Sequence, residues 1–498
     1  MIPAQLRVGL AKELGALLPT WLTALAAVAA GVLLGGGLLA TPGLLAFVIG
    51  SALLGAQAIG HEYTCGTIGM LLAQPVDRRR LYAGKLAALA MLLLLLAAAA
   101  SALVLKRPEL VRGWTGLHPL TLLAVAPLAF SMAPVLTMLT RGVLPGAVFT
   151  IAVPVVLLAA GDLTGLAMHG PAAAAQIDAV RLAVFWWGLG AACVLATIAS
   201  WRMFVRLEAL DAGHREVQMP VLWRHARGRG PARPHPLLLL AGKELRVQQM
   251  TFVVAALYAG VALIAASVES MTPGTAPLSL TAITPLYVLI LPQLAGALAS
   301  AEERQLGTLE WQVLLPVASS RQWAVKAGVA LGSALLLALG LPLLLARVHP
   351  AAALALPGAP MWQLAILIVV LTSCGLYVSS FTRSGVKALM ATLGLLLLVA
   401  LAMTTTWVLV SLLPAQSRSA IGGLFRADAA TYRVLTSTVI LTTSAGLVAA
   451  MMRFGLVNHR TAGHARVAIV GQIALLMAIL AAGAVLLQVV EIAMWPRR

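Results

Sequence analysis

The chain contains few charged residues. Only 10% of its 498 residues are Asp, Glu, Lys or Arg, whereas 61% are hydrophobic. A soluble globular domain carries roughly 25% charged residues. Apolar runs recur at about 20 residues, the length that a helix needs to cross a bilayer. We therefore expect an all-α polytopic membrane protein, and the missing apolar alternation of strands does not favour a β-barrel.

Patterns for disulfides, metals and nucleotides are also missing. The cysteines Cys65, Cys193 and Cys374 are scattered, with neither a paired framework nor metal-ligand spacing. No H-E-x-x-H sequence occurs, and no G-x4-G-K-[ST] phosphate loop occurs. We expect no metal site in this chain and no ATP hydrolysis by that route.

Carboxylates are scarce, and we place all 16 of them in loops or at the ends of predicted spans. Ion-coupled carriers usually keep ionisable groups inside the membrane, where such groups are costly unless they function. This argues against an ion-coupled secondary transporter, which remains an alternative. It favours an amphipathic or hydrophobic substrate, either a small molecule or a lipid-like one.

Two further alternatives stay open. A membrane enzyme acting on lipid-linked substrates would need clustered acidic or histidine residues in a loop, and none stands out. A non-transporting scaffold or sensor is the other alternative.

The basic residues predict the orientation. The 13 predicted spans are roughly 19–40, 43–60, 84–105, 120–139, 143–160, 182–201, 251–268, 281–300, 325–346, 362–381, 386–413, 434–452 and 467–490. With the N-terminus inside, the inner segments hold 24 of the 34 Lys and Arg residues, as the positive-inside rule requires. The net charge of +18 is then mostly topological, so we expect no nucleic-acid partner. We expect a multi-pass protein of the cytoplasmic membrane with a cytoplasmic N-terminus.

A polar segment occurs twice, 241 residues apart, at 62–85 and 303–326. Residues 11–14 and 139–141 are likewise echoed by 242–245 and 381–383. Three correspondences in the same order indicate two homologous halves. Six spans in each half give both the same orientation, related by an axis along the membrane normal.

These repeats predict the domain organisation. We expect a first six-span half at 1–205, which opens with an amphipathic helix at 3–18, and a basic cytoplasmic linker at 206–236. A second six-span half follows at 237–455, and 456–498 adds one C-terminal span without a counterpart.

Each copy of the polar segment runs from a glutamate to a proline, which bends or ends a helix. Asp77 in one copy and Ser319-Ser320 in the other are good N-caps for the next helix. The glutamates would accept charge-assisted hydrogen bonds from a basic partner or from backbone amides. The glycines would allow another backbone to approach closely. The expected anchors at the membrane interface are Lys12, Lys85, Arg141, Lys243, Lys326 and Arg383.

The pattern E-x3-G-T-x7-P-x4-R-x4-K, after an amphipathic K-E-L helix, resembles the permease subunits of ABC-2 type ATP-binding cassette exporters. The resemblance covers both halves, so the chain looks like two half-permeases fused together. It implies coupling helices at about 62–74 and 303–315, which dock on two copies of a separate ATPase subunit. ATP and magnesium would bind to that partner, and this chain would bind no cofactor. The implied coupling residues are Glu62, Gly66, Thr67, Pro75, Arg80, Glu303, Gly307, Thr308, Pro316 and Arg321.

Overall fold

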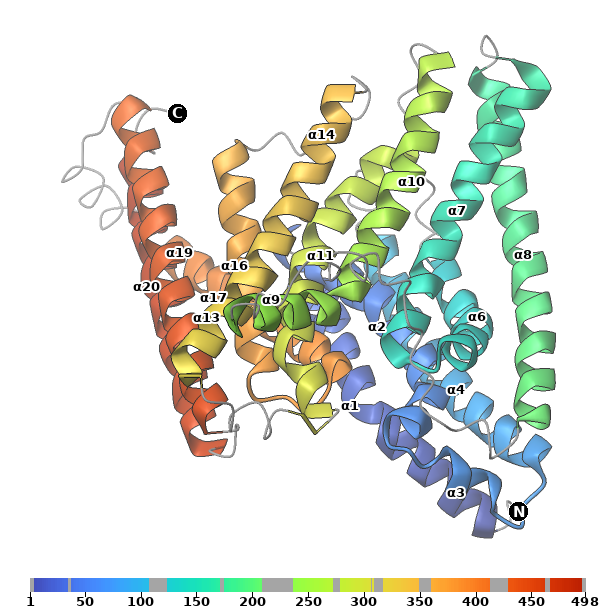
Figure 1. The fold of residues 1–498 in the computed structure, drawn as a ribbon. Coiled ribbons are helices and arrows are strands. Elements are labelled where there is room, and N and C mark those ends of the chain that lie inside the picture. Colours follow the sequence, from blue (N-terminus) through green and yellow to red (C-terminus); the bar gives the residue numbers. More distant parts are fainter. Residues whose placement is uncertain are drawn as a thin grey trace, which may run out of the picture. The chain divides into compact units, whose positions relative to one another are not determined.

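The structure, a computed structural model, is helical throughout its described residues (Figure 1). These residues are 4–34, 37–106, 123–170, 174–207, 236–271, 278–305, 307–308, 317–348, 360–412, 429–461 and 466–494. Among them, 12 helices are long and apolar enough to cross a membrane, and the shorter Val125–Thr140 is also apolar. The all-α polytopic membrane fold is confirmed, whereas the division into six, six and one spans stays a prediction.

The helices follow the predicted spans in order. In the first half they are α1 (Ala4–Leu34), α2 (Gly37–Thr64), α3 (Ile68–Leu72), α4 (Arg78–Lys106), α6 (Val125–Thr140), α7 (Val143–His169) and α8 (Ala174–Arg206). In the second half they are α9 (Pro236–Val247), α10 (Gln249–Met271), α11 (Leu278–Gln305), α13 (Ser319–Leu335), the π-helical turn η4 (Leu336–Gly340), α14 (Leu341–Val348), α16 (Met361–Ser379), α17 (Gly385–Ser411) and α19 (Ala429–Arg460). Helix α20 (Arg466–Met494) follows.

Lipid offers no hydrogen bonds, so apolar segments bond their own backbone and fold as helices. Hydroxyl groups within them follow the same rule. Thr150 donates to the carbonyl of Gly146, and Thr372 donates to that of Ile368. These two hydroxyl groups therefore lie inside spans with their donors satisfied.

Contacts divide the chain into two compact units. One holds most of α1 and α2, the helices to α10 and the end of α14, and the other holds most of α11 and the rest of the helices from α13 to α20. Helices α9 and α10 thus belong to the first unit, where α10 packs against α7. The predicted domain boundaries describe a duplication rather than compactness, and they stay predictions. Most of the predicted linker, 208–235, lies outside the described residues.

Helix α1 differs from the expectation for the first half. We expected an amphipathic helix at 3–18 that is separate from the first span, but α1 continues from Ala4 to Leu34 with Pro19 inside it. Contacts just after the proline hold the helix together. Thr20 donates to Gln57 on α2, and the indole of Trp21 donates to the carbonyl of Leu92 on α4.

The two halves repeat one close helix crossing. A Cβ on Gly55 in α2 would clash with the Ala129 carbonyl of α6, and a Cβ on Gly296 in α11 would clash with the Thr372 carbonyl of α16. The two glycines are 241 positions apart, the spacing of the polar repeat. The third span also packs against the fourth and sixth in both halves, as α4 with α6 and α8, and as α13 with α16 and α19. This shared packing supports the duplication.

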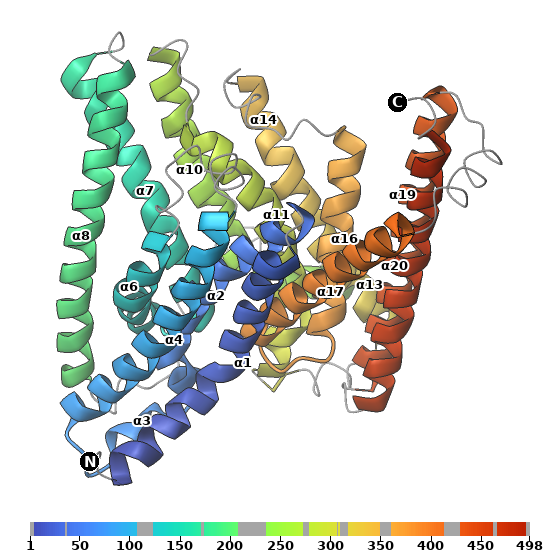
Figure 2. The same cartoon turned by 180° about the vertical axis from the view of Figure 1, so that it is seen from behind.

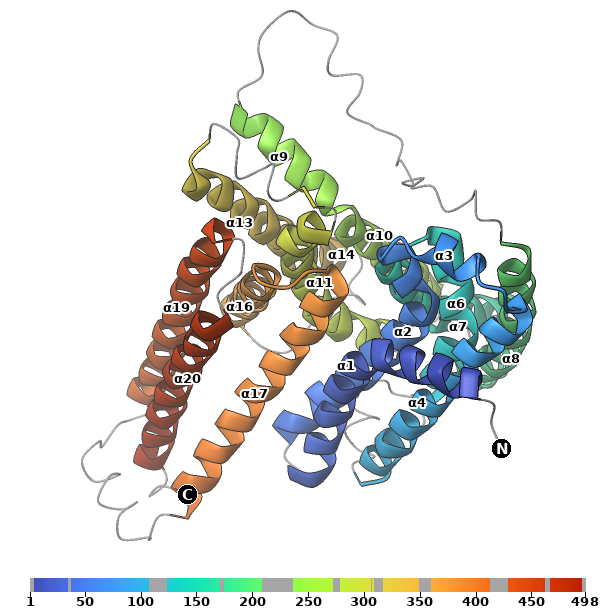
Figure 3. The same cartoon turned by 90° about the horizontal axis from the view of Figure 1, so that it is seen from below.

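Helix α20, which follows the second half, packs against both α17 and α19 (Figure 3). Its Gly483 lies against Thr443 of α19, where a Cβ would clash with the threonine side chain. The unmatched C-terminal run is therefore an integral part of the second unit.

One carboxylate contradicts the sequence analysis. Asp162 lies inside the candidate span Val143–His169 and is only 4% exposed. Helices α7 and α8 pack side by side (Figure 2), and Gly161 lets α8 approach closely at Arg181. Arg181 pairs with Asp162 at 3.3 Å and with the more exposed Asp178 at 2.8 Å. Arg181 neutralises the carboxylate of Asp162. Helix α7 therefore continues past Asp162, whereas the predicted span ended at residue 160.

We predict that Asp162→Ala lowers the free energy of unfolding by about 3–5 kcal/mol, because it leaves the buried Arg181 guanidinium short of charge. Asp162→Leu combined with Arg181→Met should lie closer to the wild type, since it removes both charges. The control is Asp178→Asn, because the Asp178 side chain is 57% exposed. This substitution should lower the free energy of unfolding by less than about 1 kcal/mol. Reversible unfolding in detergent micelles measures all three. Equal losses for Asp162→Ala and the control would contradict the prediction.

Candidate functional site

The first repeated segment forms a tight turn at the end of α2, which we call the first turn (residues 62–67). Its Thr67 N–H donates to the Glu62 carbonyl at 2.9 Å, and its Gly66 N–H donates to the Tyr63 carbonyl at 3.2 Å. Gly66 has a φ of +66°, and a Cβ there would meet nothing within 4 Å. The glycine is therefore needed for a left-handed backbone, not for the close approach of another part of the chain.

The second turn (residues 303–308) has the same geometry at the end of α11. Thr308 N–H donates to the Glu303 carbonyl at 2.9 Å, and Gly307 N–H donates to the Arg304 carbonyl at 3.2 Å. Gly307 has a φ of +68°. The repeat in sequence is thus a repeat in structure.

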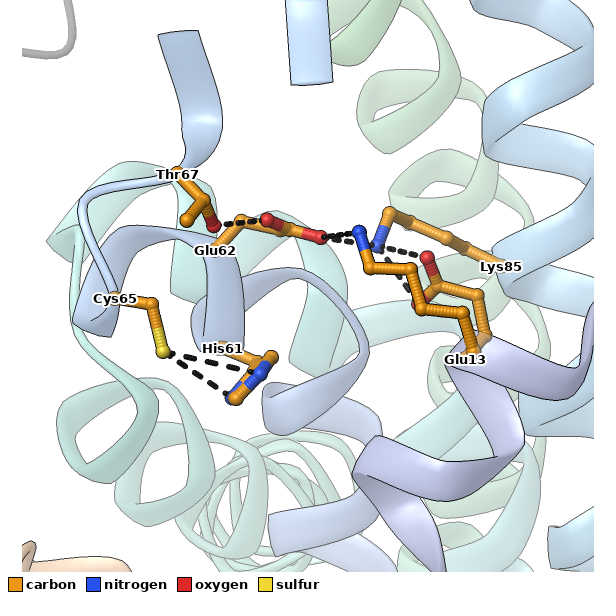
Figure 4. Close-up of polar contacts among 7 residues, drawn as sticks. Glu13, His61, Glu62, Cys65, Thr67 and Lys85 are labelled. Carbon is orange, nitrogen blue, oxygen red and sulfur yellow. Dashed lines mark hydrogen bonds and ion pairs between the residues drawn. The ribbon is translucent and has the colours of Figure 1, made fainter. Parts of the chain in front are cut away.

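Behind the first turn lies a buried group of charges (Figure 4). Lys85 on α4 places its Nζ 3.2 Å from Glu62 Oε1 and 2.8 Å from both carboxylate oxygens of Glu13 on α1. The Thr67 hydroxyl donates to the other oxygen of Glu62. Lys12 lies 3.7 Å from Glu62 and is mostly exposed. These contacts tie α1, α2 and α4 together at the turn.

Behind the second turn lies the equivalent pair. Lys326 Nζ is 2.6 Å from Glu303 Oε2 and donates to the Ala299 carbonyl at 2.7 Å. Both side chains are almost fully buried. Charged groups are rarely buried unless they are paired, so each turn is locked to the third span by one Glu–Lys pair.

The predicted interface anchors differ in their exposure. Lys85 and Lys326 are buried in the ion pairs, whereas Lys12 and Arg383 are exposed. Arg141 occupies a left-handed position (φ 53°) between α6 and α7, and Lys243 lies half-buried on α9. In the repeat of residues 139–141 at 381–383, which we call the third echo, Thr140 and Thr382 each donate to the carbonyl four residues earlier.

The segment expected to form one helix at 62–74 is divided by the first turn. Glu62 lies in the last turn of α2, and the short α3 begins only at Ile68. Pro75 and Arg80 are exposed beyond it. In the second copy Arg321 is exposed, whereas 309–316, with Pro316, lies outside the described residues.

The expected helix caps are half correct. Asp77 accepts the Arg79 N–H at 3.0 Å and caps α4, as predicted. The cap of α13 is Ala318, so the prediction of Ser319-Ser320 is wrong. The two serines form the first turn of α13, where Gln322 instead donates to the Val317 carbonyl at 2.8 Å.

The structure adds two kinds of residue near the turns that the sequence did not single out. Met70 in the middle of α3 is 75% exposed. Tyr82 and Trp323, 241 positions apart, are buried where the third span meets the sixth. Tyr82 stacks on Phe204 at 4.7 Å, and Trp323 lies 5.8 Å from His459. The spacing of 241 residues was the sequence signal for this aromatic pair. A comparison of identical residues did not reveal it, because one residue is tyrosine and the other is tryptophan.

Residues 20–161 match a family model described as ABC-2 family transporter protein. The chain fits an ABC-2 type permease. The match contains the first turn with Glu62 and Lys85, and the family supports a membrane transport component of an ABC system. No curated protein and no solved structure matches the chain. The second half of the chain lies outside the matched range and is related to the first through the repeat.

We predict that Gly66→Ala or Gly307→Ala each destabilises its own turn by about 1–2 kcal/mol, because alanine resists the left-handed backbone. Hydrogen exchange of the Thr67 and Thr308 amides, whose bonds close the turns, measures the loss. Gly69→Ala on α3 is the matched control, since a Cβ there meets nothing within 4 Å. Acceleration by Gly69→Ala as large as that by Gly66→Ala would rule out this explanation.

Proposed function

We propose that this chain is the transmembrane permease subunit of an ATP-driven ABC exporter. It moves an amphipathic or hydrophobic substrate across the cytoplasmic membrane, with the N-terminus in the cytoplasm and ATP and magnesium on a separate ATPase subunit. The observation that carries the proposal is the pair of equivalent turns, each bonded to the third span by a buried Glu–Lys pair. Two such points suit two copies of the ATPase.

The contacts of the first turn give it a means to transmit force. Thr67 immediately precedes α3 and bonds the carboxylate of Glu62. Glu62 pairs with Lys85 on α4, and Lys85 also binds Glu13 on α1. A force on α3 is therefore transmitted through one short series of hydrogen bonds and ion pairs to α1, α2 and α4.

Partner contact falls to exposed residues rather than to the glutamates. Glu62 is 2% exposed, whereas Met70 in the middle of α3 is 75% exposed. Arg79 and Arg80 are exposed in the first turn of α4 and can meet acidic groups. The repeat spacing puts Trp311, another large apolar residue, at the position that corresponds to Met70. We infer that these apolar residues dock on the ATPase, while the glutamates hold the turns.

Closure of an ATPase dimer would move both turns and shift the two halves between inward-facing and outward-facing states. This chain's part is to keep each turn rigidly connected to its spans. A lost Glu–Lys pair would let the turn move without the spans.

An ion-coupled carrier is the alternative, and the buried Asp162–Arg181 pair is the observation that favours it. An ionisable group within a span is often functional. The two mechanisms differ under an uncoupler at constant ATP, which abolishes ion-coupled transport and leaves ATP-driven transport intact.

Co-purification with a separate ATPase tests the proposal and the role of Met70. Burial of a methionine contributes about 1.5–3 kcal/mol, so Met70→Asp should weaken ATPase binding by about 10- to 100-fold. Met70→Leu, which keeps an apolar side chain of similar size, should bind like the wild type. The proposal fails if the chain never associates with an ATPase and its transport survives removal of ATP. Equal binding by Met70→Asp and Met70→Leu would reject only the docking role.

Glu62→Ala combined with Glu303→Ala should uncouple ATP hydrolysis from transport, because both turns lose their carboxylate link to the third span. The measurement is substrate moved per ATP hydrolysed in proteoliposomes, together with a check that membrane insertion is normal. Glu491→Ala, an exposed carboxylate on α20, is the control and should leave the ratio unchanged. Wild-type coupling in the double variant would remove the role assigned to the two glutamates.

A further inference from the structure

Helix α20 is joined to α19 by a reciprocal pair of side-chain amides. Asn458 Nδ2 donates to Gln472 Oε1 at 3.0 Å, and Gln472 Nε2 donates to Asn458 Oδ1 at 3.1 Å. Asn458 is 4% exposed and Gln472 is 7% exposed. Two matched hydrogen bonds in an apolar setting fix the register of the two helices.

The amide pair continues to the second turn. Asn458 Nδ2 also donates to the hydroxyl of Ser380 at 3.1 Å, at the end of α16. Arg304 Nη2 donates to the Ser380 carbonyl and, at 3.5 Å, to the Asn458 carbonyl. Arg304 directly follows Glu303, and its carbonyl accepts the Gly307 N–H that closes the turn. A continuous polar path therefore runs from α20 through α19 and α16 to the second turn.

The first half has a tyrosine and a methionine at the corresponding positions. Tyr63 corresponds to Arg304 at the spacing of 241, and Met138 corresponds to Ser380 at the spacing of 242 seen for the third echo. Both belong to a hydrophobic cluster that also contains Ile68, Leu71 and Tyr82. The residues at these two positions therefore pack in a hydrophobic cluster in the first half, whereas they join a polar network in the second.

We propose that α20 anchors the second turn, with Gln472 and Asn458 as positioning residues that act through Ser380 and Arg304. This inference rests on the proposed function, because the anchor affects transport only when an ATPase exerts force on the turn. The unmatched helix then has a role that follows from its contacts: it completes the network that replaces the hydrophobic cluster of the first half. Force applied at the second turn reaches α20, a helix to which the first half has no equivalent in sequence.

The two turns allow a comparison within one molecule. Gly66 and Thr67 make the same backbone hydrogen bonds as Gly307 and Thr308, so their amides report on the two turns under identical local geometry. In the purified chain in lipid nanodiscs, Gln472→Met should speed hydrogen exchange at Gly307 and Thr308 by about tenfold, since it leaves a buried amide without its partner. Exchange at Gly66 and Thr67 should stay within about twofold of the wild type. Gln488→Met, the same change on the same helix, is the control.

A milder pair of variants guards against misfolding. Ser380→Ala removes the hydroxyl that accepts from Asn458, whereas the hydroxyl of the neighbouring Ser379 donates to Leu376 in its own helix. We expect faster exchange at Gly307 and Thr308 in Ser380→Ala and wild-type exchange in Ser379→Ala. Unchanged exchange in both Gln472→Met and Ser380→Ala would overturn the proposal, and so would equal acceleration at both turns. No ATPase is present, so this result is independent of whether one binds.

Discussion

A buried lysine must be neutralised, and this requirement organises the end of each half at which the second candidate span meets the third. Lys85 lies beside Glu62 with both side chains 3% exposed, and Lys326 lies beside Glu303 in the same way. The lysine starts the third span and the glutamate ends the second, so the pair can form only if the chain reverses tightly between them. Glycine at φ near +67° makes that reversal possible. The repeated glutamate, glycine and lysine thus act together to hold the turn against the third span.

The two halves satisfy one further need in different ways. The last carbonyls of the sixth span lack intrahelical donors, and an arginine supplies them in each half. In the first half, Arg78 at the start of α4 donates to Val205 and Leu207. In the second half, Arg304 at the end of α11 donates to Asn458. The donor has moved from one side of the polar segment to the other, while the contact between that segment and the sixth span is kept.

The helices and the repeat could be predicted from the sequence, but the ion pairs between glutamate and lysine could not. The apolar runs and the spacing of 241 residues are local properties, and they were sufficient for the spans and the turns. The contact of Glu62 with Lys85 depends on the turn geometry, so these residues were assigned separate roles as coupling residue and surface anchor. Asp162 shows the same limit. Hydropathy ends a span at a charge, whereas the structure continues α7 because Arg181 on α8 neutralises it.

The asymmetry of the two turns bears on why both halves lie in one chain. A homodimer of one half presents two identical turns, and every substitution appears in both. A duplicated chain can change one turn alone, and Tyr63 and Met138 against the polar Arg304 and Ser380 are such changes. A polar network is directional and needs every partner in place, whereas an apolar cluster tolerates small shifts in packing. At these two positions the second turn is therefore the more strictly positioned of the two.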